Sequence, residues 1–154
     1  IIRPPLVYGP GVKANFAALM KLSSFGLPLP LGGITDNLRS MVFVENLVDL
    51  IVTCLDHHNA ANKVFLVSDD EDISTTGMLK LFSQSFGKSG FMIPMPASWF
   101  ELLGKVTGKN SVIERLCGSL QVDITDTKNS LNWKPPISIN DGFLRTVQHF
   151  QQQK

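Results

Sequence analysis

The segment RSMVFVENLVDLIVTCL, residues 39–55, decides the fold class. Its first part, residues 39–44, contains four consecutive apolar side chains, which is typical of a strand that is covered on both faces. The residues that follow match the helical template i, i+3, i+4, i+7 and i+8. The matching positions are Leu47, Leu50, Ile51, Cys54 and Leu55. A buried strand that leads into an amphipathic helix predicts an α/β protein.

Strands and helices alternate on both sides of this segment. Residues 63–68, KVFLVS, predict a second substantial strand, and residues 1–3 have the character of a strand end. Residues 4–11, PPLVYGPG, are rich in proline and glycine and predict a loop. Two or three strands are too few for a doubly wound sheet. Helices are expected over residues 12–25, 74–86, 97–106, 111–117 and 138–150, with a short helix before Trp133 and extended segments at 27–33 and 91–96.

The composition argues against several function classes. The chain has 154 residues, 14 basic and 13 acidic side chains, and a net charge of +1. The absence of a basic run gives no support to nucleic-acid binding. The longest apolar helical stretch, residues 47–55, is far shorter than the roughly 20 residues that a membrane span needs. Cys54 and Cys117 are isolated among apolar residues, so we expect reduced core thiols, no metal site and a cytoplasmic location.

Five segments, in this order, resemble the C-terminal part of extended short-chain dehydrogenases/reductases, the family of nucleotide-sugar epimerases, dehydratases and reductases. They are IIRPPLVYGPG (1–11), KANFAALM (13–20), LPLPLGG (27–33), NLRSMVFVENLVDLI (37–51) and VDITDTKNSLNWKPPISINDGF (122–143). Together they cover nearly the whole chain. The sequence departs from the family pattern at Asn132, where glycine is usual, and at Glu45 and Asn46, which replace an acidic pair.

The resemblance implies that residues 1–150 hold the last strands of a Rossmann sheet and a small α/β substrate-binding domain, with residues 151–154 as a tail. The family binds NAD or NADP through a G-x-x-G-x-x-G loop and uses a Tyr-x-x-x-Lys pair for proton transfer. Neither motif is present here. Tyr8 is the only tyrosine, Val12 stands where the lysine would be, and Pro10 has no amide hydrogen to offer a phosphate. We therefore expect a separate N-terminal NAD-binding half, no catalytic residue in this chain and no activity of the chain alone.

The resemblance assigns a diphosphate contact to Arg39. A guanidinium binds phosphate oxygens in a bidentate manner and stays charged at neutral pH. The structural alternative is an ordinary ion pair with Asp36 or a neighbour. Asn15 stands at the front of the first predicted helix, where its amide and the free backbone N–H groups could bind a phosphate. The alternative for Asn15 is an ordinary polar residue of the first turn. The functional prediction depends most on a common grip of the diphosphate by Arg39 and Asn15.

Other candidate contacts follow from the same resemblance. Leu29, Pro30 and Leu31 would lie along the uracil ring, and the alternative is a proline-stiffened core loop. Arg115 resembles a second arginine that binds the diphosphate in many relatives. Asp123 resembles an aspartate of the closing motif, and we expect it to cap the helix that follows.

The loop after the first strand would face the nicotinamide and the sugar. Pro4 and Tyr8 are the candidate cofactor contacts on this loop, and Arg3 is a candidate substrate contact. The alternative for Arg3 is a solvated side chain at a strand end.

The implied function is UDP-hexose binding within an NAD-dependent UDP-glucose 4-epimerase-like enzyme, which oxidises and reduces C4 of the sugar. Two alternatives remain open: an NAD(P)-dependent 4-keto reductase of a UDP-2-acetamido-6-deoxyhexose, and a non-catalytic nucleotide-binding sensor or scaffold. We expect NAD or NADP as the cofactor, bound mainly by the other half, and a homodimer of the full-length protein.

Overall fold

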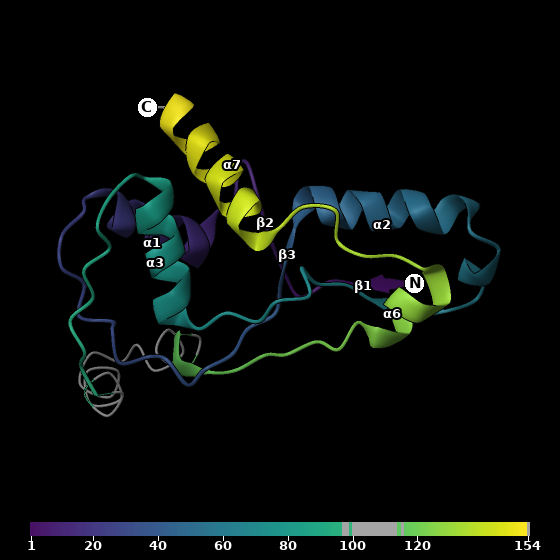
Figure 1. Ribbon diagram of the computed structural model, residues 1–154, viewed down its shortest axis with the longest axis horizontal. Helices are drawn as coiled ribbons and strands as arrows, with labels where there is room; N and C mark the ends of the chain where they lie inside the picture. Colours follow the sequence, from purple (N-terminus) through teal and green to yellow (C-terminus); the bar gives the residue numbers. More distant parts are fainter. Residues whose placement is uncertain (97–98, 100–113, 115, 154) are drawn as a thin grey trace. The chain divides into compact units, whose positions relative to one another are not determined.

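The computed structural model describes residues 1–96, 99, 114 and 116–153 (Figure 1). The chain divides into two compact units. Unit 1 comprises Ile1–Val12, Ser40–Asp72 and Leu120–Lys154, and unit 2 comprises Lys13–Arg39 and Ile73–Ser119. The predicted helix over residues 97–106 and most of the one over 111–117 lie outside the described residues.

Unit 1 contains two pairs of parallel strands. β1 (Ile2–Arg3) pairs with β4 (Phe65–Leu66), and β2 (Leu6–Tyr8) pairs with β3 (Met41–Phe43). The prediction that residues 4–11 are all loop is therefore wrong, because Leu6, Val7 and Tyr8 pair with Met41, Val42 and Phe43. All of β3 is buried, as its unbroken apolar run predicts.

The helix α2 (Val44–Asp56) follows β3 directly and begins earlier than its apolar pattern predicts. Only Leu50 of the five predicted core positions is fully buried, while Leu47 and Cys54 are half-buried. Ile51 and Leu55, which also match the helical template, are exposed. The apolar face of α2 is therefore wider than the part of it that is buried in the core of unit 1.

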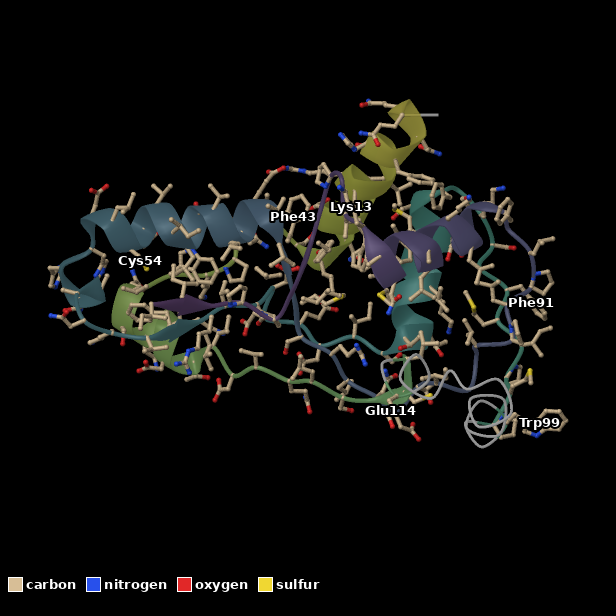
Figure 2. The ribbon with its side chains drawn as sticks, turned by 180° about the vertical axis from the view of Figure 1, so that it is seen from behind. Lys13, Phe43, Cys54, Phe91, Trp99 and Glu114 are labelled. Atoms are coloured by element: carbon tan, nitrogen blue, oxygen red, sulfur yellow. The ribbon has the colours of Figure 1, made fainter. Side chains whose placement is uncertain are left out.

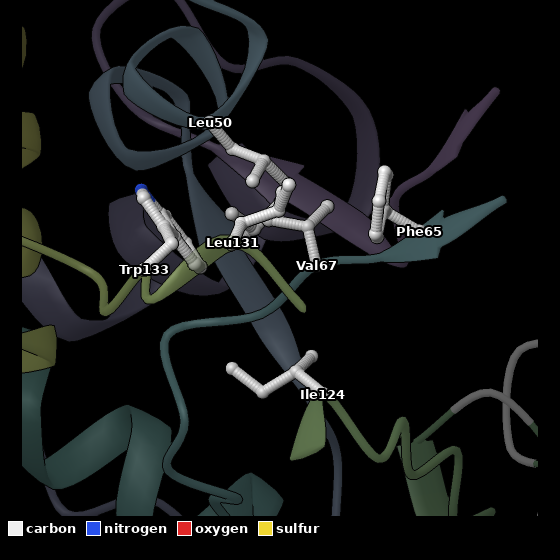
Figure 3. Packing of buried hydrophobic residues seen from close by; sticks show 7 residues of the cluster. Leu50, Phe65, Val67, Ile124, Leu131 and Trp133 are labelled. Carbon is white, nitrogen blue, oxygen red and sulfur yellow. The ribbon is translucent and has the colours of Figure 1, made fainter. Parts of the chain in front are cut away.

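The core of unit 1 lies between the strands, α2 and the short helix α6 (Thr125–Leu131) (Figure 3). The indole Nε1 of Trp133 donates a hydrogen bond to Asp49 Oδ1 at 2.6 Å, which links the segment after α6 to α2. Burial of large apolar side chains is the main force that holds such a cluster together. Its members are Val42, Leu50, Phe65, Val67, Ile124, Leu131 and Trp133.

Local hydrogen bonds and backbone conformation define the helix ends of unit 1. Ser138 caps α7 (Ile139–Gln152) by accepting a hydrogen bond from the backbone N–H of Asp141 at 3.2 Å, and its hydroxyl donates to Asp141 Oδ2 at 2.7 Å. The N-cap of α6 is Ile124, not the predicted Asp123, and α6 has no side-chain bond from its N-cap residue. Asp123 lies one residue earlier and accepts a hydrogen bond from the backbone N–H of Thr125 at 2.8 Å. Asn132 ends α6 in the left-handed region, with φ of 48°. An asparagine can adopt this conformation, so it can stand where glycine is usual.

In unit 2, α1 (Ala14–Ser24) packs against α3 (Thr75–Ser85). The rings of Phe16 and Phe82 meet edge to face with centroids 4.9 Å apart. Ser74 caps α3 by accepting a hydrogen bond from the backbone N–H of Gly77 at 3.0 Å. A second cluster of apolar residues forms the core beside these helices: Leu29, Leu31, Ile34 and Leu79. None of the described helices combines the length and the apolar character that crossing a bilayer requires.

Candidate functional site

Arg39 is held at both its backbone and its side chain within unit 2. Its backbone forms an antiparallel bridge with Ile73, with both N–H···O distances at 3.0 Å, so it lies outside the regular strand that follows. The guanidinium is half-buried, and its Nε donates to the carbonyl oxygen of Gly118 at 2.9 Å. Partial burial lowers the pKa of Arg39, against a smaller opposing effect of Cys117, but an arginine remains a cation at neutral pH.

The predicted alternative, an ion pair between Arg39 and Asp36, is wrong. Asp36 instead accepts a hydrogen bond from the hydroxyl of Thr35 at 3.0 Å. The ion pairs within the described part of the chain are Lys128–Asp70 and Arg145–Glu45. Arg39 is therefore a half-buried cation whose acceptor, among the described residues, is a neutral carbonyl.

Asn37 organises the region around Arg39. Its side chain is only 5% exposed, and its Nδ2 donates to Thr75 Oγ1 and to the carbonyl of Leu116, both at 3.0 Å. Its Oδ1 accepts from the backbone N–H of Thr75 at 3.1 Å. The Thr75 hydroxyl in turn donates to the same Leu116 carbonyl at 2.6 Å. The sequence analysis missed Asn37, because an asparagine two residues before the arginine is no recognised motif.

Asn15 lies in the first turn of α1 and is exposed. The residue before the helix, Lys13, makes no capping hydrogen bond through its side chain, so it satisfies none of the first backbone N–H groups of α1. Asn15 and Arg39 belong to the same unit but to different elements. No hydrogen bond between the two described side chains joins them, and their common grip of a diphosphate stays a prediction.

The segment predicted to hold uracil forms half of a short parallel ribbon with residues 91–93. The N–H and C=O of Leu29 bond to Phe91 and Ile93, and the C=O of Leu31 accepts from the Thr76 hydroxyl at 2.6 Å. The side chains of Leu29 and Leu31 are 4% and 8% exposed and fill the core. Both side chains are therefore part of the core, as the core-loop alternative requires, and a contact of this segment with uracil stays a prediction. Pro30 is exposed, so it alone of the three presents its side chain to a ligand.

The loop after β1 belongs to unit 1. Arg3 and Pro4 are exposed, which leaves both accessible to a ligand. Residues 7–12 and Val44 line a hollow of about 160 Å³ at the start of α2. A Cβ at Gly9 would stand 2.6 Å from Val44 Cγ1, and Gly9 has φ of 150°, so this turn requires glycine. The hollow is smaller than the roughly 300–1,000 Å³ of ordinary ligand pockets.

Tyr8 points away from the surface. Its ring is 1% exposed and packs beside Phe43 and Phe143, with centroids 5.5 and 5.0 Å away. Its hydroxyl donates to Asp69 Oδ2 at 2.8 Å. Burial, together with the neighbouring carboxylate, raises the pKa of the Tyr8 phenol. The side chain of Tyr8 belongs to the core of unit 1, so a cofactor contact at Tyr8, which stays a prediction, would involve its backbone.

Asp69 is the centre of a buried polar cluster that the sequence analysis missed. Its Oδ1 accepts from the backbone N–H of Phe43 at 2.9 Å and from Asn46 Nδ2 at 2.7 Å. Burial raises the pKa of the Asp69 carboxyl, and these hydrogen bonds, with that from Tyr8, oppose the rise. Asn46 also exchanges two hydrogen bonds with the backbone of Ile137. One feature of the sequence could have indicated this cluster: Asn46 stands where the family pattern has an acidic residue. An amide can donate a hydrogen bond to the Asp69 carboxylate, and an ionised carboxylate cannot.

Arg115 lies outside the described residues. Within the described part of the chain, no group of three or more His, Cys, Asp or Glu side chains could hold a metal ion. Cys54 and Cys117 are half-buried and are not joined by a disulfide.

No family model matches the chain. Over 152 residues it is 55% identical to UDP-glucose 4-epimerase of Vibrio cholerae, an alignment that covers 99% of this chain and 46% of that protein. The chain is a relative of the nucleotide-sugar epimerases. It is also 27% identical to N-acetyl-α-D-glucosaminyl-diphospho-ditrans,octacis-undecaprenol 4-epimerase of Escherichia coli O157:H7, over 97% of this chain and 48% of that protein. The chain therefore spans about half the length of the curated relatives that it matches.

The fold also matches solved structures of this family. UDP-glucuronic acid 4-epimerase from Bacillus cereus, in complex with UDP-glucuronic acid and NAD, aligns with a TM-score of 0.69 and 19% identity. The alignment covers 100% of this chain and 45% of that one. This likeness confirms the predicted α/β fold class, as the fold of part of an epimerase.

Proposed function

We propose that this chain binds the UDP-sugar substrate of an NAD-dependent 4-epimerase, with Arg39 as the ligand of the diphosphate. The observation that carries the proposal is the half-buried guanidinium of Arg39, whose described acceptor is a carbonyl rather than a carboxylate. The relation to UDP-glucose 4-epimerase of Vibrio cholerae supports the same substrate class. A cation held in place without a described counter-ion favours an anionic ligand.

The geometry at Arg39 suits a phosphate. Its Nε is engaged by Gly118, and none of the described residues accepts a hydrogen bond from its Nη1 or Nη2. These two atoms form the fork that matches two phosphate oxygens. Asn15 remains a second proposed contact, at the front of α1. Pro30, exposed in the same unit, is proposed to face the base. Arg3 is exposed in unit 1 and stays a separate proposed contact with the substrate.

A diphosphate anchor suits epimerisation at C4. The sugar must turn over between loss and return of the hydrogen at this carbon, while the rest of the substrate stays bound. An anchor far from the reacting carbon supplies binding energy without restraining that rotation. A one-way 4-keto reductase would use the same anchor, so it remains the alternative for the reaction, and a sensor without turnover remains the alternative of another class.

The residues present do not form a complete site for NAD. The Gly9-Pro10-Gly11 turn lacks one amide donor, and the hollow beside it, at about 160 Å³, is too small for a dinucleotide. No catalytic step is assigned to residues of this chain. NAD dependence is proposed for the full-length enzyme, by its likeness to an epimerase solved with NAD.

The test is the affinity for UDP, measured by isothermal titration calorimetry. Arg39→Ala should weaken UDP binding roughly 10- to 100-fold, because a charge-assisted hydrogen bond contributes about 1.5–3 kcal/mol. Arg145→Ala is the matched control, since Arg145 is exposed and paired with Glu45, and it should leave the affinity unchanged. Equal affinities of wild type and Arg39→Ala would refute the anchor.

Exposed apolar side chains on the ribbon formed by residues 27–31 and 91–93 favour a second candidate substrate, a sugar linked through its diphosphate to an apolar carrier. Leu27, Phe91 and Ile93 are exposed there, and Phe91 projects from the edge of unit 2 (Figure 2). The Escherichia coli relative is named for a sugar whose diphosphate links it to undecaprenol. An apolar carrier attached to the diphosphate would find an apolar surface in the unit that holds Arg39.

The two substrates can be distinguished with farnesyl diphosphate and inorganic pyrophosphate. If the carrier is a polyprenol, farnesyl diphosphate should bind more tightly than pyrophosphate, and Phe91→Ser should remove the difference. Equal binding of the two probes by wild type would exclude this candidate and leave the UDP-sugar.

A further inference from the structure

We infer that Asn37 and Thr75 are positioning residues that fix the guanidinium of Arg39 in its phosphate-binding orientation. The inference rests on the proposed role of Arg39 and extends it to two residues that need not touch the ligand.

The first step is the burial of the Asn37 amide. A primary amide that is 5% exposed is costly unless its polar atoms are satisfied, and here both ends are. Its Nδ2 reaches Thr75 Oγ1 and the Leu116 carbonyl, and its Oδ1 accepts from the N–H of Thr75. This arrangement specifies an asparagine, because aspartate lacks the donors and leucine lacks both.

The hydrogen bonds of Asn37 and Thr75 connect three segments of the chain. Asn37 is two residues before Arg39, Thr75 is the first residue of α3, and Leu116 is two residues before Gly118. The Thr75 hydroxyl also donates to the Leu116 carbonyl at 2.6 Å. Three segments that are distant in the sequence are therefore tied together at one point.

The third step is that Arg39 depends on all three segments. Its backbone bonds to Ile73, just before α3, and its Nε bonds to the carbonyl of Gly118. A Cβ at Gly118 would stand 2.6 Å from the carbonyl oxygen of Glu114, so only glycine permits the turn that presents this carbonyl. If the Asn37–Thr75 link were lost, Gly118 would be free to move, and the Arg39 side chain would lose its fixed orientation.

Loss of the Asn37–Thr75 link should affect UDP binding because the Arg39 side chain would no longer be ordered before the ligand arrives. A long side chain that is already ordered loses less conformational freedom when its ligand arrives. Removing the link should therefore weaken UDP binding roughly three- to tenfold, less than removing Arg39 itself. The contacts of Arg39 with the phosphate would be retained.

The experiment compares UDP affinities in a double-mutant cycle. Thr75→Val removes the hydroxyl and keeps the shape of the side chain, and Asn37→Ala removes the whole link. Each is combined with Arg39→Lys, which keeps a positive charge but has no Nε to bond to Gly118. Both single variants should weaken binding when Arg39 is present and have no further effect in the Arg39→Lys background.

The control is Thr127→Val in unit 1. Thr127 is also a buried threonine whose hydroxyl donates to a carbonyl, that of Leu66, at 2.7 Å. It should lower the melting temperature about as much as Thr75→Val without changing the affinity for UDP. Circular dichroism at the titration temperature establishes whether each variant is folded. If Asn37→Ala does not fold, the inference is tested with Thr75→Val alone.

Two results would overturn the inference. Unchanged affinity in Thr75→Val would show that the link does not position Arg39. Equal losses with Arg39 and with Arg39→Lys would show that the link acts on the fold as a whole. An unchanged affinity in Arg39→Ala is a different outcome, because it refutes the proposed diphosphate contact itself.

Discussion

Replacing Tyr8 by phenylalanine isolates the contribution of one buried hydrogen bond. The substitution removes the hydroxyl that donates to Asp69 Oδ2 at 2.8 Å. The ring keeps its place beside Phe43 and Phe143, so apolar packing is preserved. Asp69 retains its hydrogen bonds from Phe43 and Asn46.

The expected loss follows from the charge and burial of Asp69. A hydrogen bond to a charged group contributes about 1.5–3 kcal/mol, and the Asp69 side chain is too buried for water to replace the hydroxyl fully. For a chain of this size, 1 kcal/mol corresponds to roughly 2–4 °C in melting temperature. Tyr8→Phe should therefore lower the melting temperature by roughly 3–12 °C at neutral pH.

The loss should depend on pH. Burial raises the pKa of Asp69 in the folded state, so its contribution to stability is full below the ordinary carboxyl pKa of about 4 and is lost as pH rises through the raised value. The Tyr8 hydroxyl opposes this shift, because it favours the ionised form. Without the hydroxyl the pKa rises further, and the difference between variant and wild type should grow from acid to neutral pH.

Urea unfolding at several pH values between about 4 and 7 measures this difference, and the Asp69→Asn background serves as the control. The pH dependence of the Tyr8→Phe effect should vanish in that background, since no carboxyl remains to ionise. A loss below about 0.5 kcal/mol at neutral pH, or one that is constant across the range, would refute the reasoning.

Three further substitutions test the packing and the caps of unit 1 by thermal unfolding. Gly142→Ala should cost about 1–3 kcal/mol, because a Cβ would stand 2.5 Å from the Tyr8 hydroxyl, and the cost should be smaller in Tyr8→Phe. Asn132→Ala should cost about 1 kcal/mol, since φ is 48° there, while Asn132→Gly should cost nothing. Lys128→Ala should cost less than about 1 kcal/mol and less still at high salt, because its pair with Asp70 is largely exposed. A large, salt-independent effect of Lys128→Ala would contradict that last expectation.

The sequence predicts the regular elements where local chemistry determines them. The helix α2 and the caps of α3 and α7 follow from apolar periodicity and from Ser74 and Ser138, which act within a few residues. The strand β2 could not be predicted in the same way, because prolines and glycines flank Leu6–Tyr8. Its pairing with β3, more than 30 residues away, outweighs the local preference for a loop.

The residues of the candidate site likewise divide into those that a local motif predicts and those that depend on distant partners. Arg39 could be predicted from a motif, and the structure places it in a partly buried, oriented position. The apolar side chains of Leu29 and Leu31 are suited both to contact with a nucleotide base and to burial in a core. The packing of unit 2 shows that they are buried in its core. The roles of Asn37 and Asp69 could not be predicted from their own neighbouring residues, since the partners of their side chains lie 23 to 81 residues away in the chain.

The two buried polar clusters differ in a way that separates a structural role from a binding role. In unit 1, the charge of Asp69 is met by three donors from the protein itself. In unit 2, the Asn37 cluster is equally satisfied, but the cation that it orients is met, among the described residues, by one neutral carbonyl. Partial desolvation of a guanidinium is unfavourable unless an anion compensates it. The described part of the chain supplies no such anion to Arg39. This difference supports the proposal that the diphosphate of a nucleotide sugar compensates the charge of Arg39, whereas the charge of Asp69 is compensated within the fold.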